Sequence, residues 1–191
     1  MVMVCAEEAT VEADLVGGKL LCPNCGAELG PWGRARERVI RGVGRLRPRR
    51  AKCRGCGRTH VLLPEVCLLR RRDAVAVIGA ALAARAAGAG HRPIAGRLGV
   101  PKDTVRGWLR RFARDAEVIR AHFSRWAFAL DAELAAVPPA GGGLEDAVAV
   151  IGVAARAFVL RFGPREVWPL VAVLSGGVLL CHTSCPFPGV P

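Results

Sequence analysis

Two cysteine pairs with the same spacing constrain this chain more than any other feature. Two residues separate the cysteines within each pair, and 27 residues separate the pairs. A Cys-x2-Cys pair places two thiolates on one tight turn, and two such pairs supply the four ligands of a structural zinc site. A glycine follows each pair, and its tolerance of positive φ suits this turn. The spacing predicts a zinc ribbon with one structural Zn²⁺, bound by Cys22, Cys25, Cys53 and Cys56.

Other roles for these cysteines are less favoured. The first ten residues contain two glutamates and lack the basic and long apolar segments of a secretory signal, so we expect the reducing cytoplasm and no disulfides.

Other residues could also serve as metal ligands. His60 follows Cys56 by four residues and is an alternative ligand, but four sulfurs suffice, so we expect His60 to be a polar residue on an edge strand. Cys181, His182 and Cys185 offer only three ligands together, which favours an ordinary apolar strand or loop, and their role stays open.

Positive charge is concentrated in the first two thirds of the chain. Residues 34–72 contain 14 basic residues and two acids, and residues 91–125 contain nine and three. Arginine suits phosphate and guanine edges, but a GC-rich coding sequence also enriches arginine, so the clustering is the better evidence. The partner class indicated is nucleic acid. No apolar run reaches the roughly 18 residues of a membrane span, so we expect no membrane association.

The segment between the cysteine pairs has the pattern of a hairpin. Arginine-rich segments, residues 34–41 and 45–47, flank Gly42-Val43-Gly44, and residues 58–64 resemble a further strand that ends at Pro64. Such a hairpin would display a row of guanidinium groups. Phosphate contacts are therefore predicted for Arg36, Arg38 and Arg47.

From Asp73 onward the apolar residues recur at helical spacing. One helix extends to about residues 88–90, and a short helix, a Leu98-Gly99-Val100 turn and a second helix follow. This order matches a helix-turn-helix, whose second helix enters the major groove. Gly99 is suited to a left-handed turn, and a small shared core is expected from Ile94, Leu98, Val105 and Leu109.

The second helix carries its charges opposite its apolar side. Helix-turn-helix proteins read bases with the start of this helix, so the candidate base contacts are Lys102, Asp103, Thr104 and Arg106. The candidate phosphate contacts are Arg110, Arg111 and Arg114. The simpler alternative is that this charged face of the helix contacts only solvent and binds no DNA.

Beyond Arg114 the helix is expected to continue, with apolar residues every seven positions to Leu130. Such rows are typical of a dimerising coiled coil. A second apolar stripe over residues 144–162, after a Pro/Gly linker, allows the two helices to pack within one chain instead, and the bulky Phe and Trp side chains favour that arrangement. A homodimer stays open. Residues 73–79 recur identically at 146–152, but the similarity ends at once, so a duplicated domain is not indicated.

The predicted fold is mainly α with a small β zinc ribbon, which is followed by a helix-turn-helix helical domain. The predicted organisation is a mobile acidic lead-in over 1–19, the ribbon over 20–66, the helix-turn-helix domain over 67–134, a Pro/Gly linker over 135–143, and a C-terminal helical segment and tail over 144–191.

The ordered motifs resemble a known family. They are Cys-Pro-x-Cys-Gly with Gly30-Pro31-Trp32-Gly33, the run from Cys53 to Pro64, the three arginines 70–72, and residues 104–112. Over about residues 20–115 the chain resembles an uncharacterised bacterial family that is similar to the zinc-ribbon and helix-turn-helix front end of insertion-sequence transposases. The resemblance implies sequence-specific binding to double-stranded DNA near mobile elements.

A catalytic domain is not expected. Transposases of this type append an RNase H-like domain with three metal-binding acids, whereas only 66 residues follow Arg125 here, and their acids lie in a helical context. We therefore expect no enzyme and no small-molecule substrate. The leading hypothesis is a zinc-stabilised DNA-binding protein of the cytoplasm and nucleoid, either a transcriptional regulator or an accessory of transposition. An RNA-binding ribbon protein and a transposase remnant are the alternatives, although few aromatic residues near the ribbon could stack on RNA bases.

Overall fold

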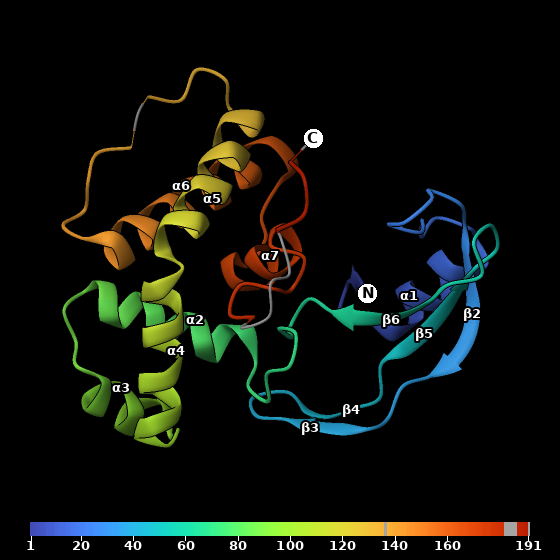
Figure 1. The fold of residues 1–191 in the computed structure, drawn as a ribbon, viewed down its shortest axis with the longest axis horizontal. Coiled ribbons are helices and arrows are strands. Elements are labelled where there is room, and N and C mark those ends of the chain that lie inside the picture. The colour runs from blue at the N-terminus through green and yellow to red at the C-terminus, as the bar shows by residue number, and fades with distance from the viewer. Residues whose placement is uncertain (136, 182–186, 191) are drawn as a thin grey trace.

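The computed structural model describes residues 1–135, 137–181 and 187–190 and has a β-rich part and a helical part (Figure 1). The strands are β1 (Val2–Val4), β2 (Leu29–Arg34), β3 (Arg38–Ile40), β4 (Gly44–Leu46), β5 (Arg49–Cys53) and β6 (Thr59–Pro64). The helices are α1 (Glu8–Val16), α2 (Val75–Ala86), α3 (His91–Leu98), α4 (Lys102–Arg114), α5 (Ala116–Leu130), α6 (Gly143–Phe162) and α7 (Val167–Leu174). The predicted fold class is confirmed: a small β region that carries the cysteine pairs precedes a helical domain.

Four strands form one sheet in the order β1-β6-β5-β2. The pairing of β1 with β6 is parallel, and the other two pairings are antiparallel. Helix α1 covers one face, where Val11 and Leu15 pack with Leu29, Ala51 and Leu62 in a small core. The predicted hairpin is confirmed as the β3–β4 pair, which forms its own two-stranded sheet, and the further predicted strand is β6.

Residues 1–19 are not the mobile lead-in that the sequence suggested. Residues 2–4 extend the sheet, and α1 packs its apolar side on the sheet while Glu8 and Glu12 form ion pairs with Arg34 and Arg49. Leu15 is fully buried. The acidic residues of α1 thus complement basic strands, and a three-residue strand is too short to show a period of its own.

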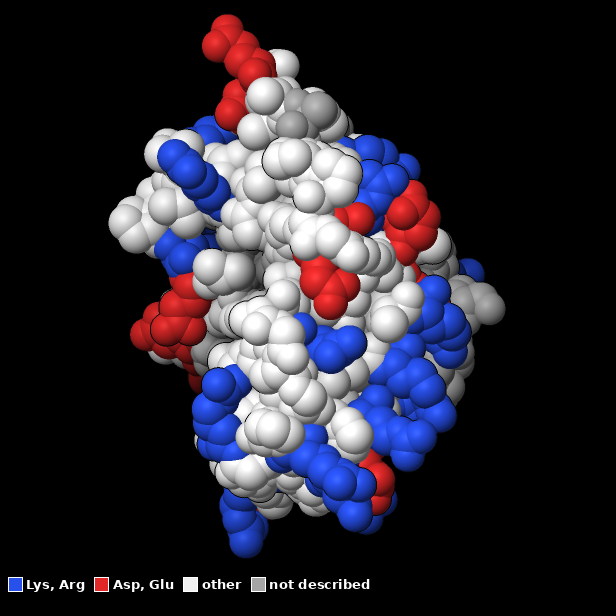
Figure 2. All heavy atoms as spheres, turned by 90° about the vertical axis from the view of Figure 1, so that its left-hand side faces the viewer, with Lys and Arg blue, Asp and Glu red and all other residues white. Residues whose placement is uncertain are grey.

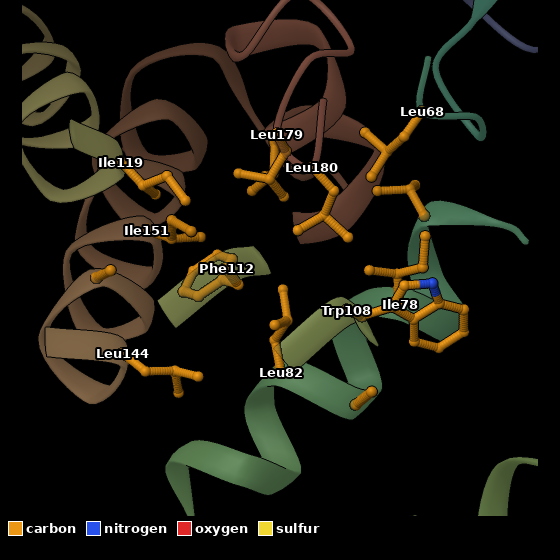
Figure 3. Packing of buried hydrophobic residues seen from close by; sticks show 14 of the residues in the cluster. Leu68, Ile78, Leu82, Trp108, Phe112, Ile119, Leu144, Ile151, Leu179 and Leu180 are labelled. Carbon is orange, nitrogen blue, oxygen red and sulfur yellow. The ribbon is translucent and has the colours of Figure 1, made fainter. Parts of the chain in front are cut away.

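The helical part has one continuous core (Figure 3). Phe112 of α4 is fully buried within it, and α2 contributes Ile78 and Leu82. α6 packs along α5, where Ile119 and Ile151 are buried in the same core. None of the helices in the described residues combines the length and apolar character needed to cross a bilayer.

The predicted continuous helix through residue 114 is interrupted. Asp115 has φ −102° and ψ 9°, and α5 starts at the next residue. Aspartate is a weak helix former, and its carboxylate here binds the neighbouring Arg114. The apolar rows nevertheless continue into α5, and packing within one chain, the favoured alternative, is confirmed because α6 covers them.

Several contacts fix the β-rich part against the helical part. Arg41 of the hairpin region forms an ion pair with Asp73 at 2.9 Å, and Glu65 forms one with Arg165. The Leu69 N–H donates to the Gly177 carbonyl at 2.8 Å. The two parts therefore meet along residues 65–74 and the turn after α7.

Candidate metal centre and nucleic-acid interface

The four predicted cysteine ligands converge at one end of the sheet. Their Sγ atoms all lie within 4.8 Å of one another, with Cys22 and Cys56 at 3.8 Å and Cys25 and Cys53 at 3.4 Å. A tetrahedral zinc site with Zn–S bonds of about 2.3 Å has sulfur–sulfur edges of about 3.8 Å. The arrangement is thus consistent with a metal site of four thiolates.

Local backbone geometry places both pairs in matching turns. The N–H of Gly26 donates to the Cys22 carbonyl at 2.8 Å, and that of Gly57 donates to the Cys53 carbonyl at 3.1 Å. Both glycines have positive φ, 74° and 71°, as the sequence suggested. A Cβ atom at Gly55 would lie 2.8 Å from the Ala27 Cβ, so glycine permits the two turns to approach.

The sulfurs differ in proton affinity. The Cys56 N–H donates to the Cys53 Sγ at 3.3 Å, and such backbone donors lower the pKa of Cys53 to about 6. At Cys25, which is exposed, the Ala27 N–H lowers the pKa, but hydrogen bonds with the neighbouring sulfurs and a smaller loss of hydration raise it to about 11. A metal bound by these sulfurs would displace the remaining protons, since thiolates are the ligands.

His60 is close to the cluster but is not one of the four ligands. Its Nε2 lies 3.4 Å from the Cys22 Sγ, and its Nδ1 lies 3.2 Å from the amino group of Met1. The expectation of an edge strand is wrong, because β6 lies inside the sheet and His60 is buried. Burial lowers the pKa of His60 below its usual value.

The helix-turn-helix geometry is present in α3 and α4. Gly99 between them has φ 61°, the left-handed conformation that the turn needs. Of the predicted shared core, Ile94, Val105 and Leu109 are buried, whereas Leu98 is only half-buried. Trp108 is also buried and anchors α4.

The opposite side of α4 faces solvent. Exposed side chains on α4 include Lys102, Asp103, Arg106, Arg110 and Arg114, and Thr104 and Arg111 are half-buried. Figure 2 shows basic side chains gathered over the lower half of the face on which α3 and α4 lie. The predicted contact residues therefore lie on an accessible basic surface.

Ion pairing divides these cations into two groups. Arg114 binds Asp115 through two hydrogen bonds of 2.7 and 2.8 Å. Among the described residues, Lys102, Arg106 and Arg110 have no carboxylate within ion-pair distance. The cations that are available to an outside anion thus lie in the first three turns of α4.

Sequence reasoning missed residues from other elements that adjoin this surface. Arg106 and Arg110 line a cleft of about 620 Å³ together with Arg85 at the end of α2, His91 at the start of α3, and Glu145 of α6. No local pattern marks Arg85, since a basic residue in the last turn of a helix is common for dipole reasons alone. Only the packing of α6 beside the helix-turn-helix reveals this cleft.

The hairpin arginines are displayed only in part. Arg36 and Arg47 are exposed and Arg38 is half-buried. Arg45 instead pairs with Glu37 at 3.1 Å. Cys181 lies in the turn after α7, whereas His182 and Cys185 fall outside the described residues.

Comparison with known families supports the predicted helix-turn-helix. The family model for a homeodomain-like domain, a helix-turn-helix type, matches residues 73–118, which span α2, α3, α4 and the start of α5. This match suggests DNA binding by that region. No curated protein and no solved structure matches the chain.

Proposed function

We propose that this protein is a zinc-stabilised DNA-binding protein that reads duplex DNA with α4. The observation that carries the proposal is that Lys102, Arg106 and Arg110 have no carboxylate partner among the described residues, while the buried side of α4 holds them outward. A rigid helix with free guanidinium groups is what major-groove reading requires.

The roles divide along the helix. Lys102, Asp103, Thr104 and Arg106 meet base edges at the start of α4, and Arg110 and Arg111 meet phosphates. Arg114 contributes less than the others in this account, because Asp115 already neutralises it. On the β-rich part, Arg36, Arg38 and Arg47 add phosphate contacts from the hairpin.

In this proposal one Zn²⁺ joins Cys22, Cys25, Cys53 and Cys56 and has a structural role. The ion supplies a cross-link between two turns, which a β region of this size otherwise lacks. Its loss would loosen β5 and β6, and with them the position of the hairpin arginines. The biological role we propose is transcriptional regulation or assistance to transposition at the nucleoid.

Duplex binding is tested with DNA fragments enriched from genomic DNA by the protein. Fluorescence anisotropy should show Kd rising steeply with salt, by about a thousandfold between 50 and 200 mM if about six phosphates are contacted. Arg110→Gln should weaken all duplexes alike, and Arg106→Ala should cost about 1–3 kcal/mol and relax preference at one base. Arg156→Gln, an exposed arginine of α6, is the charge-matched control. A flat salt response would refute the proposal, as would tighter binding to structured RNA in competition.

The zinc part is tested by metal content. Reduced, purified protein should contain one zinc per chain, and Cys22→Ser should lower that content and the stability of the β-rich part. Cys5→Ser is the control, because Cys5 lies outside the cluster. Unchanged folding and metal content in Cys22→Ser would remove zinc from the proposal.

Paired half-sites would require two copies of the chain. Since α6 already covers the apolar rows of α5, a dimer would have to use another surface. Light scattering with and without a duplex measures this directly.

A further inference from the structure

α1 covers one face of the sheet in the β-rich part, and the opposite face is buried at Leu63 but open around Trp32 and Lys52. The face that α1 covers carries Leu29 and Ala51. On the open side Trp32 of β2 is 51% exposed, and the Lys52 ammonium lies 4.4 Å from the centre of its ring. An exposed indole beside a free cation offers the two groups that a nucleotide contacts, a flat π surface and a positive charge.

A groove adjoins this open face. It has a volume of about 530 Å³ and lies between β6 and the segment that leads into the β3–β4 hairpin. Val61, Leu63 and Pro48 give it an apolar lining. Thr59, the cross-strand partner of Lys52, lines the groove, and so does Ala35, three positions after Trp32, so the exposed ring and its cation adjoin the groove.

The groove carries net positive charge. Arg36 and Arg38 line it together with one acid, Glu37, and that acid is already paired with Arg45. The Nε atoms of Arg38 and of the nearby strand residue Arg50 are buried and have no hydrogen-bond acceptor within the described residues. A buried donor without an acceptor is costly, so these guanidinium groups favour an incoming anion.

We propose that this open face and groove bind single-stranded DNA. A base stacks on Trp32, its phosphate lies near Lys52, and the strand continues into the groove, where Arg36 and Arg38 meet further phosphates. In a duplex both faces of each base are already stacked, so an exposed ring and an apolar floor can be used only by unpaired bases. The choice of DNA over RNA rests on the proposed function of α4, whereas the stacking site itself does not.

The test uses the full reduced chain with its zinc and a fluorescein-labelled oligo(dT) of about 12 nucleotides, within the range of known single-strand sites. Anisotropy should show binding, and Trp32→Leu should weaken it about tenfold, since stacking on one aromatic ring has an effect of this order. Trp32→Phe should retain most of the affinity. Lys52→Gln should weaken binding, whereas Lys19→Gln should not, because Lys19 pairs with Asp14 away from this face.

Duplex binding on the same preparations separates Trp32 and Lys52 from α4, since only Arg36 and Arg38 are proposed to contact phosphates of both ligands. Trp32→Leu should leave the duplex Kd unchanged, and Arg110→Gln should leave the oligo(dT) Kd unchanged. If Trp32→Leu and Lys52→Gln keep wild-type affinity for oligo(dT), the contact between them is structural only and the proposal fails. Tighter binding to oligo(U) would overturn the assignment to DNA. If the wild-type chain binds oligo(dT) but no duplex, the proposed role of α4 is refuted and the single-strand site at Trp32 is retained.

Discussion

The same seven residues, Asp-Ala-Val-Ala-Val-Ile-Gly, occur at 73–79 and 146–152 in different surroundings. Both copies bury their isoleucine, Ile78 or Ile151, but the first copy buries Val75 whereas the second buries Val150. Their ends differ. The first aspartate is buried and paired with Arg41, and Gly79 lies beneath Trp168, whereas Gly152 is exposed with nothing near it. Apolar spacing therefore sets only in part which side of a helix faces inward, and distant segments decide the rest and what each position costs to change.

Substitution of Gly79, which Trp168 covers, should destabilise the chain more than any other change considered, in contrast to substitution of the exposed Gly152. A Cβ at Gly79 would overlap the indole of Trp168, so Gly79→Ala must displace α7 or distort α2. We expect a loss of about 3 kcal/mol in the free energy of unfolding, at the upper end for overpacked cores. Urea denaturation followed by far-UV circular dichroism measures it. A loss below that of an average surface substitution would contradict the close contact.

Loss of the Arg41–Asp73 ion pair, at the start of residues 73–79, should have the next largest effect on stability. Arg41→Gln removes the ion-pair partner of the buried Asp73 carboxylate and leaves only the more weakly acting Arg71, so we expect a loss of about 1.5 kcal/mol at neutral pH, limited by the half-exposed Arg41. Arg45→Gln is the control, since its partner Glu37 is exposed. Equal losses in the two variants would show that burial of Asp73 is unimportant.

Gly152→Ala should change stability in the opposite direction. Among the described residues outside the helix's own backbone, no atom lies within 4 Å of the added methyl group, and alanine is the better helix former, so we expect a gain of about 0.5–1 kcal/mol. A shift of the urea midpoint to higher concentration at constant slope would confirm it. A loss here would mean that the second copy is also covered, for example by a partner chain.

The pH dependence of Asp73 should be the smallest effect. Burial raises the pKa of Asp73, although Arg41 and Arg71 partly oppose the shift. The folded chain therefore holds this proton more tightly than the unfolded chain, and protonation favours folding. The contribution of Asp73 to the free energy of unfolding should decline as the pH rises from the ordinary carboxyl pKa to the raised pKa. Above the raised pKa it should stay constant. Asp73→Asn should remove this decline in urea titrations that run from acid to neutral pH, with the wild-type chain as the reference.

The features that sequence reasoning located correctly are those set by neighbouring residues. Cysteine spacing fixes the two turns because both ligands of a pair lie on one turn, and Gly99 with Ile94 and Val105 fixes the turn between α3 and α4. The missed features depend on distant contacts. Strand β1 exists only because β6 offers a parallel edge, and Arg85 joins the α4 cleft only because α6 lies beside it. No period within one segment encodes such pairings.

The packing of β1 against the turn after α7 has a consequence for biosynthesis. A Cβ at Gly177 would lie 2.8 Å from the Met3 Sδ, so the second to fourth residues and residue 177 are in direct apposition. During translation, both motifs can form while the later helices are still inside the ribosome. The Arg41–Asp73 contact can set their mutual orientation in part, and the contact with residue 177 completes it only after that residue has emerged. A product that ends before residue 177 would retain the cysteine turns, α4 and the Arg41–Asp73 contact but would lack the second contact between the two parts.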